Sequence, residues 1–183
     1  MKKFVIDKDD TSLLVVDIQD RLAAAMKMKG SVIANTIHLI ELAKMLDVPI
    51  IITEQYPKGL GPTVSEVIDV LPAYHPIEKL SFSCCGEPNF MDLLKLQNRK
   101  TVILTGMETH ICVLQTCIDL LREGLFVHLA RDAVCSRTKA NWRAGVEFMR
   151  DAGAIITSTE TVLFQALKVA GTEAFKTISK RIR

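Results

Sequence analysis

The chain has 183 residues, of which 49% are hydrophobic and 24% are charged, and its net charge is only +2. This composition is typical of a globular protein, and the length suits one domain, which we expect to span residues 1–183. The near-neutral charge argues against a nucleic-acid-binding protein, which would present a strongly basic surface.

The sequence carries no signal for a membrane or an export pathway. No segment approaches the roughly 18 to 20 apolar residues of a membrane helix, and the N-terminal MKKFVIDKDD lacks the apolar core of a signal peptide. The five cysteines are an odd number without a CxxC pair, which predicts free thiols in a reducing compartment. We therefore expect a cytoplasmic protein that does not bind a membrane.

Strand and helix patterns alternate along the first half of the chain. Residues 12–19 (SLLVVDIQ) and 48–55 (VPIIITEQ) are apolar runs that predict buried strands, and residues 31–47 between them have the polar stripe of a helix. The glycines and prolines of residues 56–63 (YPKGLGPT) predict a loop. The next predicted elements are a short helix at 65–71, a weak strand at 78–85 and a helix at 88–96.

The second half continues the alternation. Its predicted strands are 100–106, 125–130 and 154–158, and its predicted helices are 109–124, 138–153, 159–167 and a tail from Thr172. Thr109 is the expected N-cap of the helix at 109–124. Such alternation predicts a parallel sheet with right-handed crossovers, in which ligands bind beyond the carboxyl ends of the strands.

Three residues could carry chemistry, and two of them, Asp17 and Cys112, lie near the ends of predicted strands. Cys112 is the third residue of its predicted helix, where the positive end of the helix favours a thiolate; from position alone, a buried core thiol is an equally good interpretation. Asp17 ends an apolar run and is either a cap or a base. From its sequence context Lys79 is expected to be a surface lysine, unless the fold brings it next to Asp17 and Cys112. Cys117 and Cys135 lack such placement and are expected to be core thiols.

Three ordered segments carry a family resemblance. LLVVDIQD, EKLSFS and TGMETHICV resemble the signature segments of the isochorismatase-like cysteine hydrolase superfamily, and TEQYPKGLGPTV resembles its isochorismatase domain-containing subgroup. The resemblance runs over residues 12–167. It implies a three-layer α/β/α fold with a six-stranded, mostly parallel sheet of Rossmann-like topology. It also implies a catalytic triad of Asp17, Lys79 and Cys112.

The resemblance implies further features of the site. A cis peptide bond between Met107 and Glu108 is expected to turn the Glu108 N–H toward the Cys112 N–H, so that both form an oxyanion hole. Members of the family are commonly dimers or larger, which predicts a homo-oligomer, either a dimer or a tetramer. Nicotinamidases of the family hold a metal through an aspartate and two histidines near the second strand. TEQYPKGLG contains no histidine, so we expect neither a metal nor another cofactor.

The resulting prediction is a hydrolase that cleaves an amide or related C–N bond of a small molecule through a Cys112 thioester. The candidate substrate-binding residues are Gln19, Gln55, Tyr56, Phe82 and His110, each of which could instead serve loop structure or packing. Two other functions remain open: a binding or scaffold protein with little turnover, and a redox sensor that uses a low-pKa Cys112.

Overall fold

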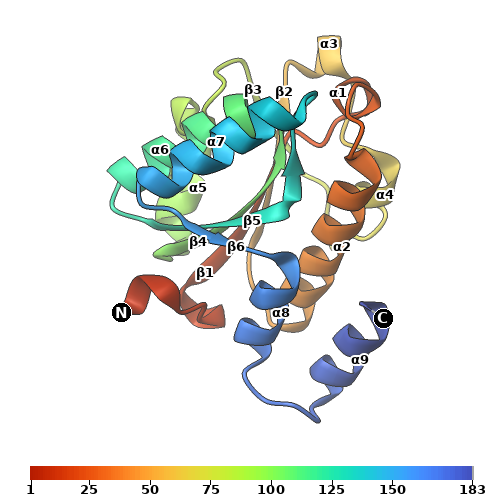
Figure 1. Ribbon diagram of the computed structural model, residues 1–183, viewed down its shortest axis with the longest axis vertical. Coiled ribbons are helices and arrows are strands. Elements are labelled where there is room, and N and C mark those ends of the chain that lie inside the picture. The colour runs from red at the N-terminus through yellow and green to blue at the C-terminus, as the bar shows by residue number, and fades with distance from the viewer. Residues whose placement is uncertain (183) are drawn as a thin grey trace.

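A computed structural model describes residues 1–182 and places one twisted sheet between two layers of helices (Figure 1). The strands are β1 (Thr11–Val16), β2 (Ile50–Gln55), β3 (Ile77–Lys79), β4 (Thr101–Met107), β5 (Phe126–Cys135) and β6 (Ile155–Thr157). Their order in the sheet is β3-β2-β1-β4-β5-β6, and all neighbouring pairs are parallel. The expected three-layer fold with a six-stranded parallel sheet is confirmed.

The connections between strands contain the helices. They are α1 (Asp20–Ala24), α2 (Lys29–Met45), α3 (Pro57–Leu60), α4 (Ser65–Ile68), α5 (Pro88–Gln97), α6 (Leu114–Arg122), α7 (Lys139–Asp151), α8 (Thr159–Leu167) and α9 (Glu173–Arg181). Short 3-10 turns are η1 (Lys2–Phe4), η2 (Lys8–Asp10) and η3 (Cys84–Gly86), and η4 (Thr109–Val113) is a π-helical turn. Within residues 1–182, no helix is both long and apolar enough to cross a lipid bilayer.

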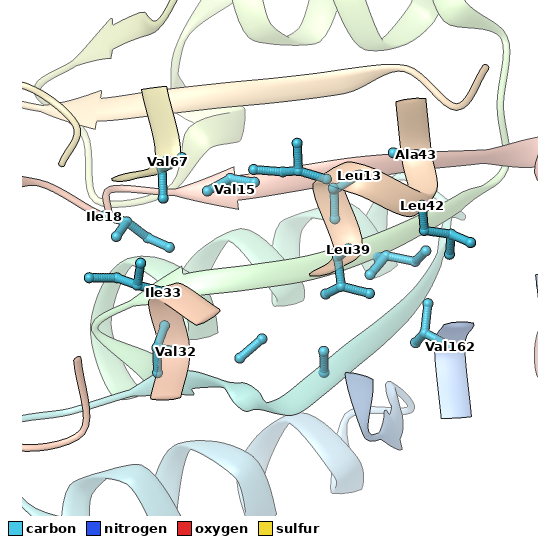
Figure 2. Close-up of a cluster of buried hydrophobic side chains, with 14 of the residues drawn as sticks. Leu13, Val15, Ile18, Val32, Ile33, Leu39, Leu42, Ala43, Val67 and Val162 are labelled. Carbon is cyan, nitrogen blue, oxygen red and sulfur yellow. The ribbon is translucent and has the colours of Figure 1, made fainter. Parts of the chain in front are cut away.

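Both faces of the sheet are buried, which explains the continuous apolar runs. Leu13 and Val15 of β1 point to one face and pack with α2, α4 and α8, as Figure 2 shows. Leu14 and Val16 point to the opposite face and pack with residues of α5, α6 and α7. Alternate positions of one strand thus enter two separate cores, so the strand has no polar face.

Several element boundaries differ from the sequence prediction. β5 runs to Cys135, well beyond the predicted 125–130, with a register shift against β4 between Leu104 and Gly106. Residues 78–85 supply only the last part of β3 before the chain turns into η3. Residues 57–60, predicted as loop, form the single turn α3.

The predicted N-cap of the helix at 109–124 was wrong. The helix begins with the π turn η4, and Glu108 occupies the N-cap position without a side-chain bond. The hydroxyl of Thr109 is buried and has no hydrogen-bond partner among the described residues. The close contact with α7 explains its burial, since Gly145 of that helix lies directly against the backbone of Thr109 and His110.

A close backbone approach fixes the edge of the sheet where β1 and β4 end. Gly106 has φ +123°, and a Cβ atom there would lie 1.9 Å from the Val16 carbonyl oxygen. Only glycine allows the two strands to pair at this point. The approach sets the positions of the residues that follow each strand, Asp17 and the segment from Met107 onward.

Candidate active site

Asp17 immediately follows β1 and turns the chain sharply out of the sheet. Its φ is +51° and its side chain is fully buried. The Asp17 N–H donates to the Thr53 carbonyl at 3.2 Å, and Oδ1 accepts a 2.7 Å hydrogen bond from Thr53 Oγ1. The neighbouring strand β2 therefore holds the carboxylate in one orientation and leaves Oδ2 for other partners.

Lys79 ends β3 and reaches across β2 to this carboxylate. Its Nζ lies 2.7 Å from Asp17 Oδ2, and both side chains are fully buried. The ammonium also donates to Gln55 Oε1 at 2.7 Å and to the carbonyl oxygens of Phe82 and Ser81 at 3.1 and 3.3 Å. Such a set of oxygen acceptors suits a charged lysine. The surface location suggested by its sequence context alone is wrong.

Cys112 lies in η4, beyond the end of β4, and is only 5% exposed. Its Sγ is 4.0 Å from Gln55 Oε1, the same atom that accepts from Lys79. The charges of Asp17 and Lys79 both act on the thiol. Three side chains that are distant in sequence thus meet at the carboxyl ends of β1 and β3 and the segment after β4.

The three groups shift one another's protonation. Burial first and the Asp17 charge second raise the pKa of Cys112 to about 12, against the opposing effect of Lys79. Burial also raises the pKa of Asp17, while the Lys79 ammonium lowers it. Burial lowers the pKa of Lys79, but the charges of Asp17, Cys84 and Cys112 and the hydrogen bond to Asp17 together outweigh burial, so the pKa is raised.

These shifts favour a neutral Cys112 thiol. The helix-terminal position of Cys112 favours a thiolate, and the burial of its side chain opposes that charge. A nucleophilic Cys112 would have to transfer its proton to a base when it reacts.

The segment before the cysteine is held from the opposite side by the end of β5 and the residues that follow it. The Met107–Glu108 peptide bond is cis. Glu108 Oε2 accepts from the Arg137 N–H at 3.0 Å and from its Nε at 3.2 Å. His110 Nδ1 lies 2.9 Å from Ser136 Oγ. The chain that follows the cis bond is therefore tied to residues 136 and 137.

The five candidate substrate residues fall into different environments. Gln19 is fully buried and its amide group bonds the Gln55 N–H, the Gln55 carbonyl and the Gly61 carbonyl. The side chain of Gln55 accepts from Lys79 Nζ through Oε1 and donates through Nε2 to the Leu80 carbonyl at 2.8 Å. Tyr56 and Phe82 are 51% and 53% exposed at the same sheet edge, and His110 is half-buried.

Sequence reasoning missed two neighbours of the triad. Thr53 pairs in register with Val16, which places its hydroxyl beside Asp17. Cys84 is fully buried, and its Sγ lies 3.7 Å from Thr53 Oγ1; its pKa is raised to about 11 by burial first and by Asp17 second. The register of adjacent strands could have identified Thr53, whereas Cys84 lies in a loop whose path the sequence does not specify.

The donor chemistry of the region gives no sign of a metal. Among residues 1–182, no three side chains of His, Cys, Asp or Glu gather where they could hold a metal ion. The polar groups at the centre of the site are instead a carboxylate, an ammonium, a thiol and an amide.

The fold and site define an α/β protein with a buried Asp, Lys and Cys at the carboxyl edge of a parallel sheet. Residues 11–161 match the isochorismatase domain, and the chain belongs to the isochorismatase-like hydrolase family. It is 40% identical to a secreted isochorismatase effector of Phytophthora sojae, over 93% of this chain and 83% of that protein. It is 34% identical to isochorismatase domain-containing protein 2 of Rattus norvegicus, over 96% of this chain and 82% of that protein.

A solved structure agrees with this assignment. A protein described as the MAR1 ribonuclease of Caenorhabditis elegans superposes with a TM-score of 0.91 and is 39% identical, covering 97% of this chain and 92% of that one. The resemblance noted in the three sequence segments is therefore confirmed at the level of the family and the fold.

Proposed function

We propose that the protein is a cysteine hydrolase that cleaves an amide or related C–N bond of a small molecule through a thioester on Cys112. The observation that carries the proposal is the buried contact of 2.7 Å between Lys79 Nζ and Asp17 Oδ2, next to an almost enclosed thiol. A buried ion pair contributes little to stability by itself, so its presence beside a nucleophile favours a chemical role.

The first step forms the thioester. Asp17 accepts the Cys112 proton as the sulfur attacks the substrate carbonyl, and an S–C bond forms while the carbonyl π electrons move to oxygen. The raised pKa of Asp17 makes it a better base, and Lys79 stabilises the negative charge that moves from carboxylate to sulfur. The N–H groups of Glu108 and Cys112 are proposed to bind the oxyanion.

The next steps return the site to its starting state. The C–N bond breaks as Asp17, now protonated, gives its proton to the leaving amine or ammonia. Water then attacks the thioester with Asp17 as base, and the C–S bond breaks to give a carboxylic acid or carbamate while Asp17 returns the proton to the Cys112 sulfur. Each bond formed or broken is accompanied by one proton transfer through the same carboxyl group, so no further acid is needed.

Two groups at the edge of the site are suited to substrate contact. Tyr56 and Phe82 are the exposed aromatic side chains there, and we propose that they bind the apolar part of the substrate. Gln55 is placed to position Lys79 relative to Cys112, and Gln19 is placed to hold Gln55. His110 is proposed to face the substrate from the segment of the nucleophile.

The test is a panel of small amides, ureas and carbamoyl compounds, assayed for release of amine or ammonia. Wild-type protein should turn over at least one compound and acquire the mass of an acyl adduct on Cys112. Cys112→Ala should show neither. Cys117→Ala is the matched control, because Cys117 is also a buried thiol but lies on α6 away from the triad. Full turnover by Cys112→Ala would refute the mechanism.

Two other functions receive less support. A redox sensor requires an accessible thiol of low pKa, whereas burial raises the pKa of Cys112.

One solved relative is described as a ribonuclease, so RNA belongs in the substrate panel. A triad that can form a thioester favours acyl over phosphoryl chemistry. A scaffold function would be supported if the whole panel, RNA included, gave no turnover and no adduct.

We further propose that the chain forms a homo-oligomer in a reducing, cytoplasmic compartment. Leu80 is 74% exposed next to the exposed Tyr56 and Phe82, which gives the edge of the site an apolar surface suited to a second copy. All five cysteines are free, as suits a reducing compartment. Light scattering on the purified protein would test the oligomer, and a mass of one chain would contradict it.

A further inference from the structure

A cavity lies at the edge of the sheet where Asp17, Lys79 and Cys112 meet, but none of these three residues lines it. It has a volume of about 630 Å³ and opens where the end of β5, the start of α2 and the start of α7 come together (Figure 1). Its walls include Met28 and Val32 from α2, Val134 from β5 and Trp142 from α7. The cavity is large enough for a small organic molecule.

The charges around this cavity are strongly one-sided. Four cations line it: Lys27, Arg131, Arg137 and Lys139. Of these, only Arg137 has an ion-pair partner among residues 1–182, namely Glu108. The one acid in the wall, Asp132, directs Oδ1 to the Thr159 N–H and hydroxyl at 2.8 and 3.0 Å. Three cationic groups are therefore available to an anion in the cavity.

The end of α2 adds to the positive potential. Met28 is its N-cap residue and makes no side-chain bond to the exposed backbone N–H groups, and the first turn contains no acidic residue. The 17-residue helix thus directs an uncompensated positive end toward the cavity, where Met28 and Ser31 are wall residues. This effect supports the cations and would not define a site without them.

A flat apolar surface lies beside the cations. The indole of Trp142 is half-buried and held by a 3.2 Å hydrogen bond from Nε1 to the Arg131 carbonyl. Asn35 bonds the Asp132 carbonyl at 2.8 Å and fixes the opposite wall. A rigid aromatic ring next to unpaired cations suits a ligand with a planar apolar part and an anionic group.

We propose that this cavity binds a small aromatic carboxylate or a similar planar organic anion. The carboxylate would lie near Arg131 and Lys139, and the ring would pack against Trp142. The site is separate from the proposed catalysis, but Arg137 and Ser136 in its wall contact Glu108 and His110 of the nucleophile segment. The cavity is therefore a second ligand site adjoining the proposed active site.

The single tryptophan makes the proposal directly testable without an activity assay. Trp142 is the only tryptophan in the chain and lines this cavity, so fluorescence excited at wavelengths that tyrosine does not absorb comes from this residue. Benzoate should change the emission saturably in the roughly millimolar range expected for so small a ligand, at constant ionic strength. Benzyl alcohol, which has the ring but no charge, and inorganic phosphate, which has the charge but no ring, should each bind about tenfold more weakly.

Variants identify the groups responsible. Arg131→Gln and Lys139→Gln should each weaken benzoate binding by about three- to tenfold, because each removes one unpaired cation from the wall. Arg150→Gln, which removes an exposed cation from the far end of α7, should bind as the wild type does. Unsaturable quenching, equal binding of benzyl alcohol or phosphate, or wild-type affinity in both wall variants would each overturn the proposal.

Discussion

Among residues 1–182, the carboxylate of Asp17 has a single cationic partner, Lys79, and both side chains are buried. We predict that Asp17→Asn lowers turnover by roughly 10³-fold or more, because the base is lost. It should also lower the free energy of unfolding by about 3–5 kcal/mol, since Lys79 is left charged and unpaired in the interior.

The double variant Asp17→Asn/Lys79→Met separates the two effects. Removal of both charges should restore most of the stability but none of the activity, because an apolar side chain tolerates burial that an unpaired ammonium does not. Chemical denaturation and the amide panel would measure the two properties. A double variant that regained turnover would show that the pair has no part in the chemistry.

The thiol of Cys112 offers a second prediction at the residue scale. Because burial raises its pKa to about 12, alkylation by iodoacetamide should accelerate about tenfold per pH unit from pH 7 to 10 without a plateau. The rate at each pH is obtained from the mass of the Cys112 peptide. Asp17→Asn should lower the midpoint, since the charge that raises the thiol pKa is gone. A midpoint below the free-thiol value of about 8.5 would contradict the neutral resting state.

At the scale of elements, α7 packs against the π turn η4, which contains Cys112, the proposed nucleophile. A Cβ atom on Gly145 would lie 3.0 Å from His110 Cα and 3.0 Å from the Thr109 carbonyl oxygen. Gly145→Ala should destabilise the protein by about 1–3 kcal/mol and reduce kcat/KM by roughly tenfold, because η4 and Cys112 are displaced.

Gly30 of α2 provides the matched control, because a Cβ atom there would meet nothing within 4 Å. Gly30→Ala should leave kcat/KM unchanged and raise stability by up to about 1 kcal/mol, as alanine favours a helix over glycine. Thermal unfolding and steady-state kinetics measure both variants. Equal behaviour of the two would show that the α7–η4 contact does not position the site.

At the scale of the whole molecule, buried thiols link stability to alkaline pH. Burial raises the pKa of Cys117 from 9.0 to about 12. The folded state therefore keeps a proton that the unfolded state loses, so the stabilisation is complete below pH 9 and is lost as pH rises toward 12. This thiol should lower the free energy of unfolding by about 1.4 kcal/mol per pH unit in that window.

Replacement of that thiol tests the linkage. Cys117→Ala should be less stable than wild type at pH 8, because the substitution leaves a small cavity. Above pH 9 its free energy of unfolding should fall less steeply with pH, because the contribution of one proton to the slope is removed. Urea denaturation at several pH values measures the slopes. Parallel curves for the two proteins would show that Cys117 ionises equally in both states.

The alternation of strands and helices, and the residues at the strand ends, could be predicted from the amino-acid sequence. Apolar runs such as 12–19 predicted buried parallel strands, because a strand covered on both faces leaves no polar pattern. The three ordered segments identified the family and, through it, a role for Lys79 that no spacing could supply. Thr53 could also have been predicted, because the register of β1 against β2 places it next to Asp17.

How these residues act on one another depends on the tertiary structure. The packing of α5, α6 and α7 over one face buries Cys112, and this burial raises its pKa and opposes the thiolate that its helix-terminal position favours. The start of the helix is a π turn, and Thr109 has no capping bond among residues 1–182. Hydration and long-range contacts set these properties, and neither is encoded in the local order of residues along the chain.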